Sequence, residues 1–302
     1  MSGPTVEWVE VAPRDGLQSW PDTIPSPMKV RLITRLLDCG FRRVEATSMV
    51  SPRAIPQLAD AEQVLEALQD RMSNLRVLVP NVKGMERALR ARVRQVAVTV
   101  GATDAYNRQN LNRSVAETLR EIRQVVEMAG SEVQVDASVS VAFGCPYDGP
   151  VPIERVLDVC RSLVDNGIQE ISLGDTIGIA NPAQVEEVFQ AAREAIPHLR
   201  WGAHFHDTRG MALANILSAL ETGISLFEGS LGGIGGSPAA PGTAGNVCSE
   251  DALYMLDAMG IHTGIDVPRL ISVAREAEQI LGKPLPGRVH VAPEAEPRRV
   301  PA

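Results

Sequence analysis

The strongest constraint on the fold of this chain is an alternation of short β-branched segments with longer segments of helical periodicity, repeated along its length. In segments 28–37 and 153–164, for example, the apolar residues recur every three or four positions, as on one face of an amphipathic helix. The β-branched segments have the length and composition of buried strands. Eight of them are expected to form strands, namely 6–11, 43–46, 76–79, 95–100, 133–139, 170–173, 200–204 and 225–228.

Strands that alternate with helices in this way indicate parallel βαβ units. Gly40, Gly130, Gly167 and Gly223 each follow a helical segment, at the position where a glycine commonly ends a helix. Eight such units in roughly 250 residues predict an α/β protein with a closed (β/α)8 TIM barrel. The alternative is a doubly wound open sheet, but no GxGxxG motif follows the first expected strand to favour it.

No linker divides the chain of 302 residues, and with 44% hydrophobic residues it can bury a large core. We expect residues 1–282 to form one catalytic barrel domain that includes an additional C-terminal helix at 267–281. Segment 283–302 ends in a stretch rich in proline, glutamate and arginine, so we expect it to be a flexible tail.

The net charge, the cysteine spacing and the features of the first residues argue against several classes of protein. A formal net charge of −8 argues against a nucleic-acid partner, which requires a basic surface. The four cysteines lack CxxC spacing, and the first residues lack the features of a signal or transit peptide. No apolar run approaches the roughly 20 residues needed to span a bilayer. We therefore expect a cytoplasmic protein that does not enter a membrane.

Polar side chains stand where the expected strands end. In a TIM barrel the catalytic groups lie at the carboxyl ends of the strands, so these residues are expected to share one rim. The first, second, fifth, sixth and seventh strands contain or lead into such residues: Arg14 and Asp15, Glu45, Ser138 and Ser140, Asp175, and His204 and His206.

The two histidines suggest a metal site. His204 and His206 are two positions apart on an expected strand, so their side chains point to the same side of the barrel. With Asp15 across the rim they could bind one ion, and Asn246 could add an amide oxygen, although its position equally suits a turn. Because no thiolate is offered, these ligand types favour Mg²⁺ or Mn²⁺ over Zn²⁺.

Six motifs, in order along the chain, resemble the 3-hydroxy-3-methylglutaryl-CoA (HMG-CoA) lyase family, part of a broader superfamily of metal-dependent barrel lyases and aldolases. The resemblance covers about residues 6–282. The motifs are VAPRDGLQ (11–18), FRRVEATSMVSP (41–52), FGCPYDG (143–149), EISLGDTIGIANP (170–182), HFHDTRGMALAN (204–215) and GGIGGSPAAPGTAGN (232–246).

The resemblance implies a reaction, a cofactor and a set of site residues. A short 3-hydroxyacyl-CoA would be cleaved between C2 and C3 to acetyl-CoA and a keto acid, by a homo-oligomer, a dimer in this family. Asp15, His204, His206 and Asn246 would bind a divalent ion, Mg²⁺ or Mn²⁺. Arg14 would contact the thioester oxygen of the substrate. The other catalytic residues implied are Asp15, Glu45, Asp175, His204 and Ser237. Substrate would be bound by Arg14, Gln18 and Ser138.

One position departs from the family. The lyases carry a catalytic cysteine before the proline of the glycine-rich motif, where this chain has Ser237. A thiol with a pKa near 8.5 exchanges protons at neutral pH far more readily than a serine hydroxyl does. Three explanations fit: a different acyl substrate such as citramalyl-CoA, a weak or inactive lyase, or an introduced Cys→Ser substitution. Cys145 is not expected to replace the missing thiol.

Two other functions share these features. An acyl-CoA synthase working in the aldol direction, related to isopropylmalate synthase, would have the same barrel and the same histidine pair. The CPYDG and GGSPAAPGTAGN motifs argue against it. A non-enzymatic acyl-CoA-binding protein stabilised by a metal is the other alternative, and Ser237 is the residue that keeps it open.

Overall fold

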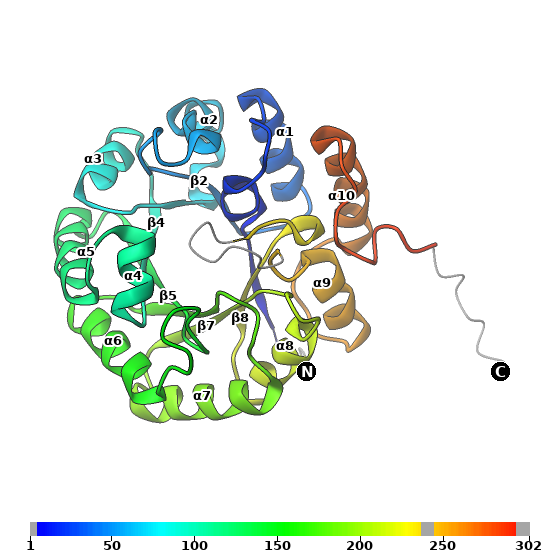
Figure 1. Ribbon diagram of the computed structural model, residues 1–302. Helices are drawn as coiled ribbons and strands as arrows, with labels where there is room; N and C mark the ends of the chain where they lie inside the picture. The colour runs from blue at the N-terminus through cyan, green and yellow to red at the C-terminus, as the bar shows by residue number, and fades with distance from the viewer. Residues whose placement is uncertain (1–4, 237–244, 294–302) are drawn as a thin grey trace, which may run out of the picture.

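The computed structural model describes residues 5–236 and 245–293, and it confirms the predicted TIM barrel. Eight strands pair in parallel, in chain order, and the first closes the barrel against the last (Figure 1). This closure excludes the doubly wound open sheet. The strands are β1 (Glu7–Glu10), β2 (Arg43–Ser48), β3 (Leu75–Leu78), β4 (Gln95–Gly101), β5 (Gln134–Ser140), β6 (Glu170–Asp175), β7 (Arg200–Phe205) and β8 (Leu226–Gly229).

Helices surround the barrel as an outer ring (Figure 1). The expected C-terminal helix is present as α10, which packs against α1 and α9. The helices are α1 (Ser26–Leu37), α2 (Ala61–Ala67), α3 (Val82–Arg90), α4 (Asp104–Leu111), α5 (Val115–Ala129), α6 (Ile153–Asp165), α7 (Pro182–Ala195), α8 (Ala212–Glu221), α9 (Ser249–Ala258) and α10 (Val267–Leu281).

The core explains the sequence pattern. Every residue of β2, β6 and β8 is buried, because these strands are covered by helices outside and by side chains inside the barrel. The helices bury only one stripe, which gives their apolar residues the 3.6-residue period. Gly40 shows why glycine ends one of them: its φ is +101°, and a Cβ there would lie 2.5 Å from the carbonyl oxygen of Gly264.

An ion network fills the barrel at the amino-terminal ends of the strands. Arg43 pairs with Glu7 at 2.6 Å, with Asp136 at 2.9 Å and with Glu170 at 2.5 Å. Arg43 is 4% exposed, and its guanidinium is bonded on several sides, as a buried charge requires. The interior of this end of the barrel is therefore filled by charged side chains that pair with one another.

The first part of the expected tail packs on the barrel. Leu285 and His290 are buried, and the His290 ring lies 2.8 Å from Glu250 and 3.3 Å from Glu278. Residues 294–302 lie outside the described part, so the division of the chain at residue 282 stays a prediction. In the described residues no helix is long and apolar enough to cross a membrane.

Candidate active site

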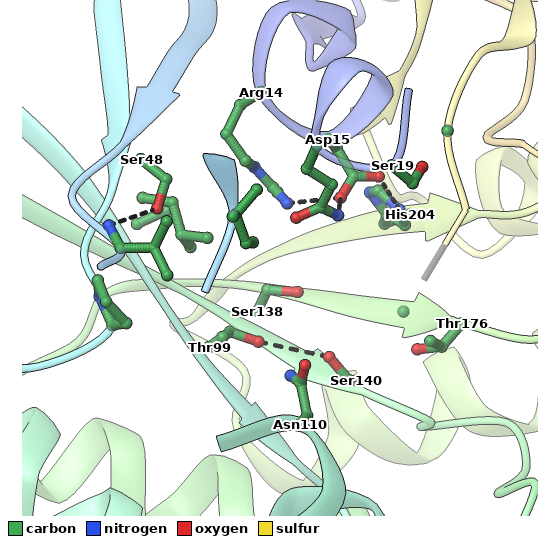
Figure 2. Close-up of a pocket in the computed structure, with 18 of the residues that line it drawn as sticks. Arg14, Asp15, Ser19, Ser48, Thr99, Asn110, Ser138, Ser140, Thr176 and His204 are labelled. Atoms are coloured by element: carbon green, nitrogen blue, oxygen red, sulfur yellow. Dashed lines mark hydrogen bonds and ion pairs between the residues drawn. The ribbon is translucent and has the colours of Figure 1, made fainter. Parts of the chain in front are cut away.

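A cavity of about 770 Å³ lies inside the rim formed by the carboxyl ends of the strands (Figure 2). Its lining combines ionisable groups on or beside β1, β3, β7 and β8 with hydroxyl and apolar side chains from β4, β5 and α4. The structure thus brings together most of the residues that the sequence singled out. Those that line the cavity are Arg14, Asp15, Gln18, Ser138, His204 and His206.

Arg14 and Asp15 lie on a tight π-helical turn, η1 (Ala12–Gly16), and not at the end of a strand as the sequence suggested. The Asp15 N–H donates to the carbonyl oxygen of Val11 at 2.8 Å, so the chain turns immediately after β1. A Cβ on Gly16 would lie 2.6 Å from the Ile234 side chain, which makes glycine necessary for this packing. The turn holds both functional side chains over the barrel.

The predicted metal ligands are close together. Asp15, His204 and His206 are buried, and one potential ligand atom from each lies within 4.8 Å of the others. The rings of the two histidines are 5.3 Å apart, as same-face neighbours should be. Residues 246 and 206 form a β-bridge, which explains how Asn246 reaches the site.

The Asn246 amide provides a direct test of whether the site fits a cation. Its Nδ2 donates to Asp15 Oδ2 at 2.7 Å, while its Oδ1 is buried without a hydrogen-bond partner among the described residues. A buried acceptor of this kind normally has a partner, since leaving it unsatisfied costs free energy. A hard divalent ion with oxygen and imidazole ligands would satisfy it. The residues present therefore fit Mg²⁺ or Mn²⁺.

Glu228, which the sequence reasoning missed, orients His204. Its Oε2 lies 2.9 Å from His204 Nδ1, so the ionised carboxylate accepts the Nδ1 proton and leaves the Nε2 lone pair toward Asp15, 4.0 Å away. Burial alone would lower the pKa of His204, but the hydrogen bond and charge of Glu228 outweigh it and raise that pKa. The sequence did offer a signal for Glu228: it is a carboxylate in an expected buried strand, next to the strand that carries a histidine expected to bind the metal.

Arg14 is held by carboxylates. Its Nε donates to Glu45 and its Nη1 to Asp15, while Gln18 donates to the same Asp15 oxygen at 2.7 Å. Burial alone would raise the pKa of Asp15, but Arg14 and both histidines outweigh it and lower that pKa. The Nη2 group of Arg14 has no partner among the described residues, so it is available to a ligand in the cavity.

A second arginine lies deeper in the barrel and was also missed. Arg76, on β3, pairs with Glu45 at 2.7 Å and with Glu228 at 2.8 Å. Burial alone would lower its pKa, but Glu228 and Glu45 outweigh it and raise that pKa. Burial alone would likewise raise the pKa of Glu228, and Arg76 and His204 instead hold it well below its usual range. An arginine in the middle of an apolar strand segment was the available signal.

Two predicted site residues are not part of this arrangement. Asp175 ends β6, but it does not line the cavity: its carboxylate oxygens each accept a backbone N–H at 3.0 Å, from Ile179 and Ala180. Asp175 thus orders the loop after β6, and its expected place among the catalytic carboxylates is not supported by these contacts. Ser237 lies outside the described residues.

Comparison with known proteins agrees with this geometry. The HMGL-like family model matches residues 5–276. The hydroxymethylglutaryl-CoA lyase YngG of Bacillus subtilis is 44% identical over 281 residues, which cover 92% of this chain and 94% of that protein.

Solved structures show the same relationship. The crystal structure of the HMG-CoA lyase of Bacillus subtilis superposes with a TM-score of 0.90 at 43% identity, over 95% of this chain and 97% of that one. An HMG-CoA lyase of Acinetobacter baumannii, solved with coenzyme A and 3-methylmalate, gives a TM-score of 0.92 at 35% identity and covers 98% of both chains. This chain, with its closed barrel and its Asp15–His204–His206 cluster, belongs to the HMGL-like family.

Proposed function

We propose that this chain is a carbon–carbon lyase that cleaves a short 3-hydroxyacyl-CoA of the HMG-CoA type into acetyl-CoA and a keto acid. The observation that carries the proposal is the meeting of two groups at one cavity: a cation site at Asp15, His204 and His206, and a guanidinium, Arg14, beside it. The lyases that this chain resembles over nearly its whole length give the substrate class.

The metal would be held by Asp15, His204, His206 and the Oδ1 of Asn246. When bound, a divalent ion of this type supplies Lewis acidity, which makes a hydroxyl group on the substrate easier to deprotonate. The protein keeps the ligands ready for it: Glu228 fixes the tautomer of His204, and the amide of Asn246 orients Asp15.

Arg14 would act on the charge that the reaction creates. A general base would take the proton of the 3-hydroxyl, whose oxygen then forms the ketone while the C2–C3 bond breaks and the electron pair moves through C2 onto the thioester oxygen. A proton donated to C2 would then convert this enolate into acetyl-CoA. Arg14 remains cationic at any physiological pH, and its Nη2 is available to donate to that oxygen. Because Glu45 and Asp15 already hold the guanidinium, little reorganisation is needed during the step.

The far wall of the cavity would receive the acyl chain. Ser138 and the bonded pair Thr99 and Ser140 offer hydroxyl groups from β4 and β5 (Figure 2). Gln18, which donates to Asp15 at 2.7 Å, also lines the cavity. These uncharged donors suit the carboxylate and carbonyl oxygens of a small acyl group. The cavity of about 770 Å³ is large enough for such a group with part of its pantetheine arm.

The test is a cleavage assay with purified protein, HMG-CoA, citramalyl-CoA and related thioesters, with Mn²⁺ and with chelator. We expect metal-dependent release of acetyl-CoA, and Arg14→Gln should lower kcat roughly 10²-fold or more, as for loss of an oxyanion donor. Arg31→Gln, an exposed arginine on α1, is the matched control. Native kcat in Arg14→Gln, or no cleavage of any thioester by the unaltered protein, would contradict the proposal.

Two further expectations accompany this function. We infer from the family resemblance that the protein assembles as a homo-oligomer, and size-exclusion chromatography with light scattering tests this. The cytoplasmic location expected from the sequence also remains a prediction, tested by fractionating cells that express the chain.

A further inference from the structure

The Arg76 guanidinium links the part of the site around Arg14 with the part around the metal ligand His204. Its Nη2 lies 2.7 Å from Glu45, and its Nη1 lies 2.8 Å from Glu228. Glu45 in turn accepts from Arg14, and Glu228 lies against the Nδ1 of His204. One cation therefore sits between the carboxylate that holds the oxyanion donor and the carboxylate that holds a metal ligand.

The charges around Arg76 require a cation at this place. Asp15, Glu45 and Glu228 are all buried, and without Arg76 the one arginine that still contacts any of them in the described part of the chain is Arg14. Buried like charges repel strongly unless a counter-charge lies between them. Arg76 itself is 3% exposed, so both of its partners come from the protein.

The geometry suits an arginine better than a lysine, because Nη1 donates a hydrogen bond to Glu228 while Nη2 forms an ion pair with Glu45. Residue 76 on β3 is in register with Glu45 on β2, whereas Glu228 belongs to β8, beyond β1. A planar guanidinium has several donors in a rigid fork and can bond two carboxylates from different strands at once. A lysine ammonium is a single point charge, and it would have to favour one carboxylate over the other.

We propose that Arg76 is a positioning residue that sets the orientation of both Arg14 and His204, through Glu45 and Glu228. In this role it acts through these two carboxylates, although its side chain also lines the cavity. Without it, the partners left among the described residues are Ser172, at 3.1 Å, and His204 for Glu228, and Arg14 for Glu45. Both carboxylates are then held less firmly, so that His204 and Arg14 lose part of their fixed orientation together. The effect on Arg14 rests on the proposed function, whereas the effect on His204 concerns metal binding alone.

Arg43 provides a matched control because it is the same residue type in a similar setting. Both arginines are 4% exposed at the side chain and bridge several carboxylates inside the barrel. Arg43, however, lies at the amino-terminal end, and its partners Glu7, Asp136 and Glu170 do not line the cavity. Replacing Arg43 reports the cost of losing a buried cation whose ion-pair partners lie outside the lining of the cavity.

The experiment measures Mn²⁺ affinity by isothermal titration calorimetry, urea unfolding, and kcat and KM on any thioester that is cleaved. Arg76→Met should weaken Mn²⁺ binding by roughly 10–100-fold, the range for losing a group that orients a metal ligand, and should lower kcat more than it raises KM. Arg43→Met should be destabilised as well but should bind Mn²⁺ within about twofold of the unaltered protein. Arg76→Lys should recover only part of the affinity, and it serves as the main variant if Arg76→Met does not fold.

Three results would overturn the role of Arg76: native Mn²⁺ affinity in Arg76→Met, an equal loss of affinity in Arg43→Met, or full recovery in Arg76→Lys. The last would mean that charge alone matters and that the bridging geometry does not. If the unaltered protein cleaves no thioester, the proposed function fails, but the Mn²⁺ titrations still decide whether Arg76 positions His204.

Discussion

Asn246 illustrates how much the site depends on the arrangement of single atoms. Its amide nitrogen holds Asp15, and its amide oxygen is buried with no partner in the described part of the chain. The same side chain thus orients one metal ligand and offers another. The two ring nitrogens of His204 likewise have different roles: Nδ1 is hydrogen-bonded to Glu228, and Nε2 faces Asp15 at the proposed metal site.

Ser237 stands where the resemblance to the lyases leads us to expect a catalytic cysteine. If only the missing thiol limits the activity, Ser237→Cys should raise the cleavage rate of HMG-CoA, by up to the roughly 10²–10⁴-fold that a general acid contributes. The physical reason is that a thiol transfers a proton near neutral pH and a serine hydroxyl does not. Steady-state rates with saturating Mn²⁺ check this.

The control is Ser272→Cys, the same change at an exposed position on α10. An unchanged rate in Ser237→Cys, together with good cleavage of another 3-hydroxyacyl-CoA by the natural serine form, would show that the HMG-CoA assignment is wrong. The fold and the metal site would stand.

At the scale of the elements, residues 283–293, which follow α10, are connected through Glu250 to the start of the glycine-rich motif at Gly232. His290 is bonded to Glu250 at 2.8 Å, and the other oxygen of Glu250 accepts the N–H of Gly232 at 2.9 Å. Gly287 packs so closely that a Cβ there would lie 2.6 Å from the sulfur of Cys248. Residues 283–293 therefore connect α9, α10 and the chain after β8.

This connection predicts a pH-dependent contribution to stability. The hydrogen bond and charge of Glu250 raise the pKa of His290 above its unfolded value near 6.5. The folded state therefore binds the His290 proton more tightly, and the stabilisation is complete below pH 6.5 and is lost as the pH rises through the folded pKa. His290→Gln should cost roughly 1.5–3 kcal/mol at pH 6, the range for a hydrogen bond to a charged group.

Urea unfolding of both proteins from pH 6 to pH 9 measures this, and the gap between them should narrow as the pH rises. His198→Gln, outside this cluster, is the control for replacing a histidine elsewhere. A gap that is constant with pH, or that widens, would mean that His290 is not held as a cation.

The elements also show what the sequence could and could not reveal. The strands were predictable because short β-branched runs and the 3.6-residue period of the helices between them are local features of the sequence. The histidine pair was predictable because residues two positions apart on a strand share a face. The turn η1 was not, since it depends on Gly16 packing against Ile234, more than 200 positions away. Arg76 and Glu228 each stand out in an apolar strand segment, but they are 152 positions apart, so the sequence alone could not show that they form an ion pair. Asp175 ends a strand, as its motif indicated, and its carboxylate accepts backbone N–H groups of the following loop, so its catalytic role stays a prediction.

For the whole molecule, the barrel separates two polar regions with different roles. At the amino-terminal end the Arg43 network is closed, with each charge bonded inside the protein. At the other end the polar groups surround a cavity, and some donors and acceptors, such as Asn246 Oδ1, lack protein partners among the described residues. This asymmetry is what the barrel architecture predicts for an enzyme with one active face.

The central claim is that this face holds one catalytic divalent ion, and crystals grown with Mn²⁺ test it most directly. An anomalous difference map collected at the manganese edge should show one strong peak per chain, in contact with Asp15, His204, His206 and Asn246. Crystals of His206→Ala grown in the same way should show a much weaker peak or none. A dominant peak elsewhere in the chain, or an undiminished peak at the rim in His206→Ala, would contradict the account.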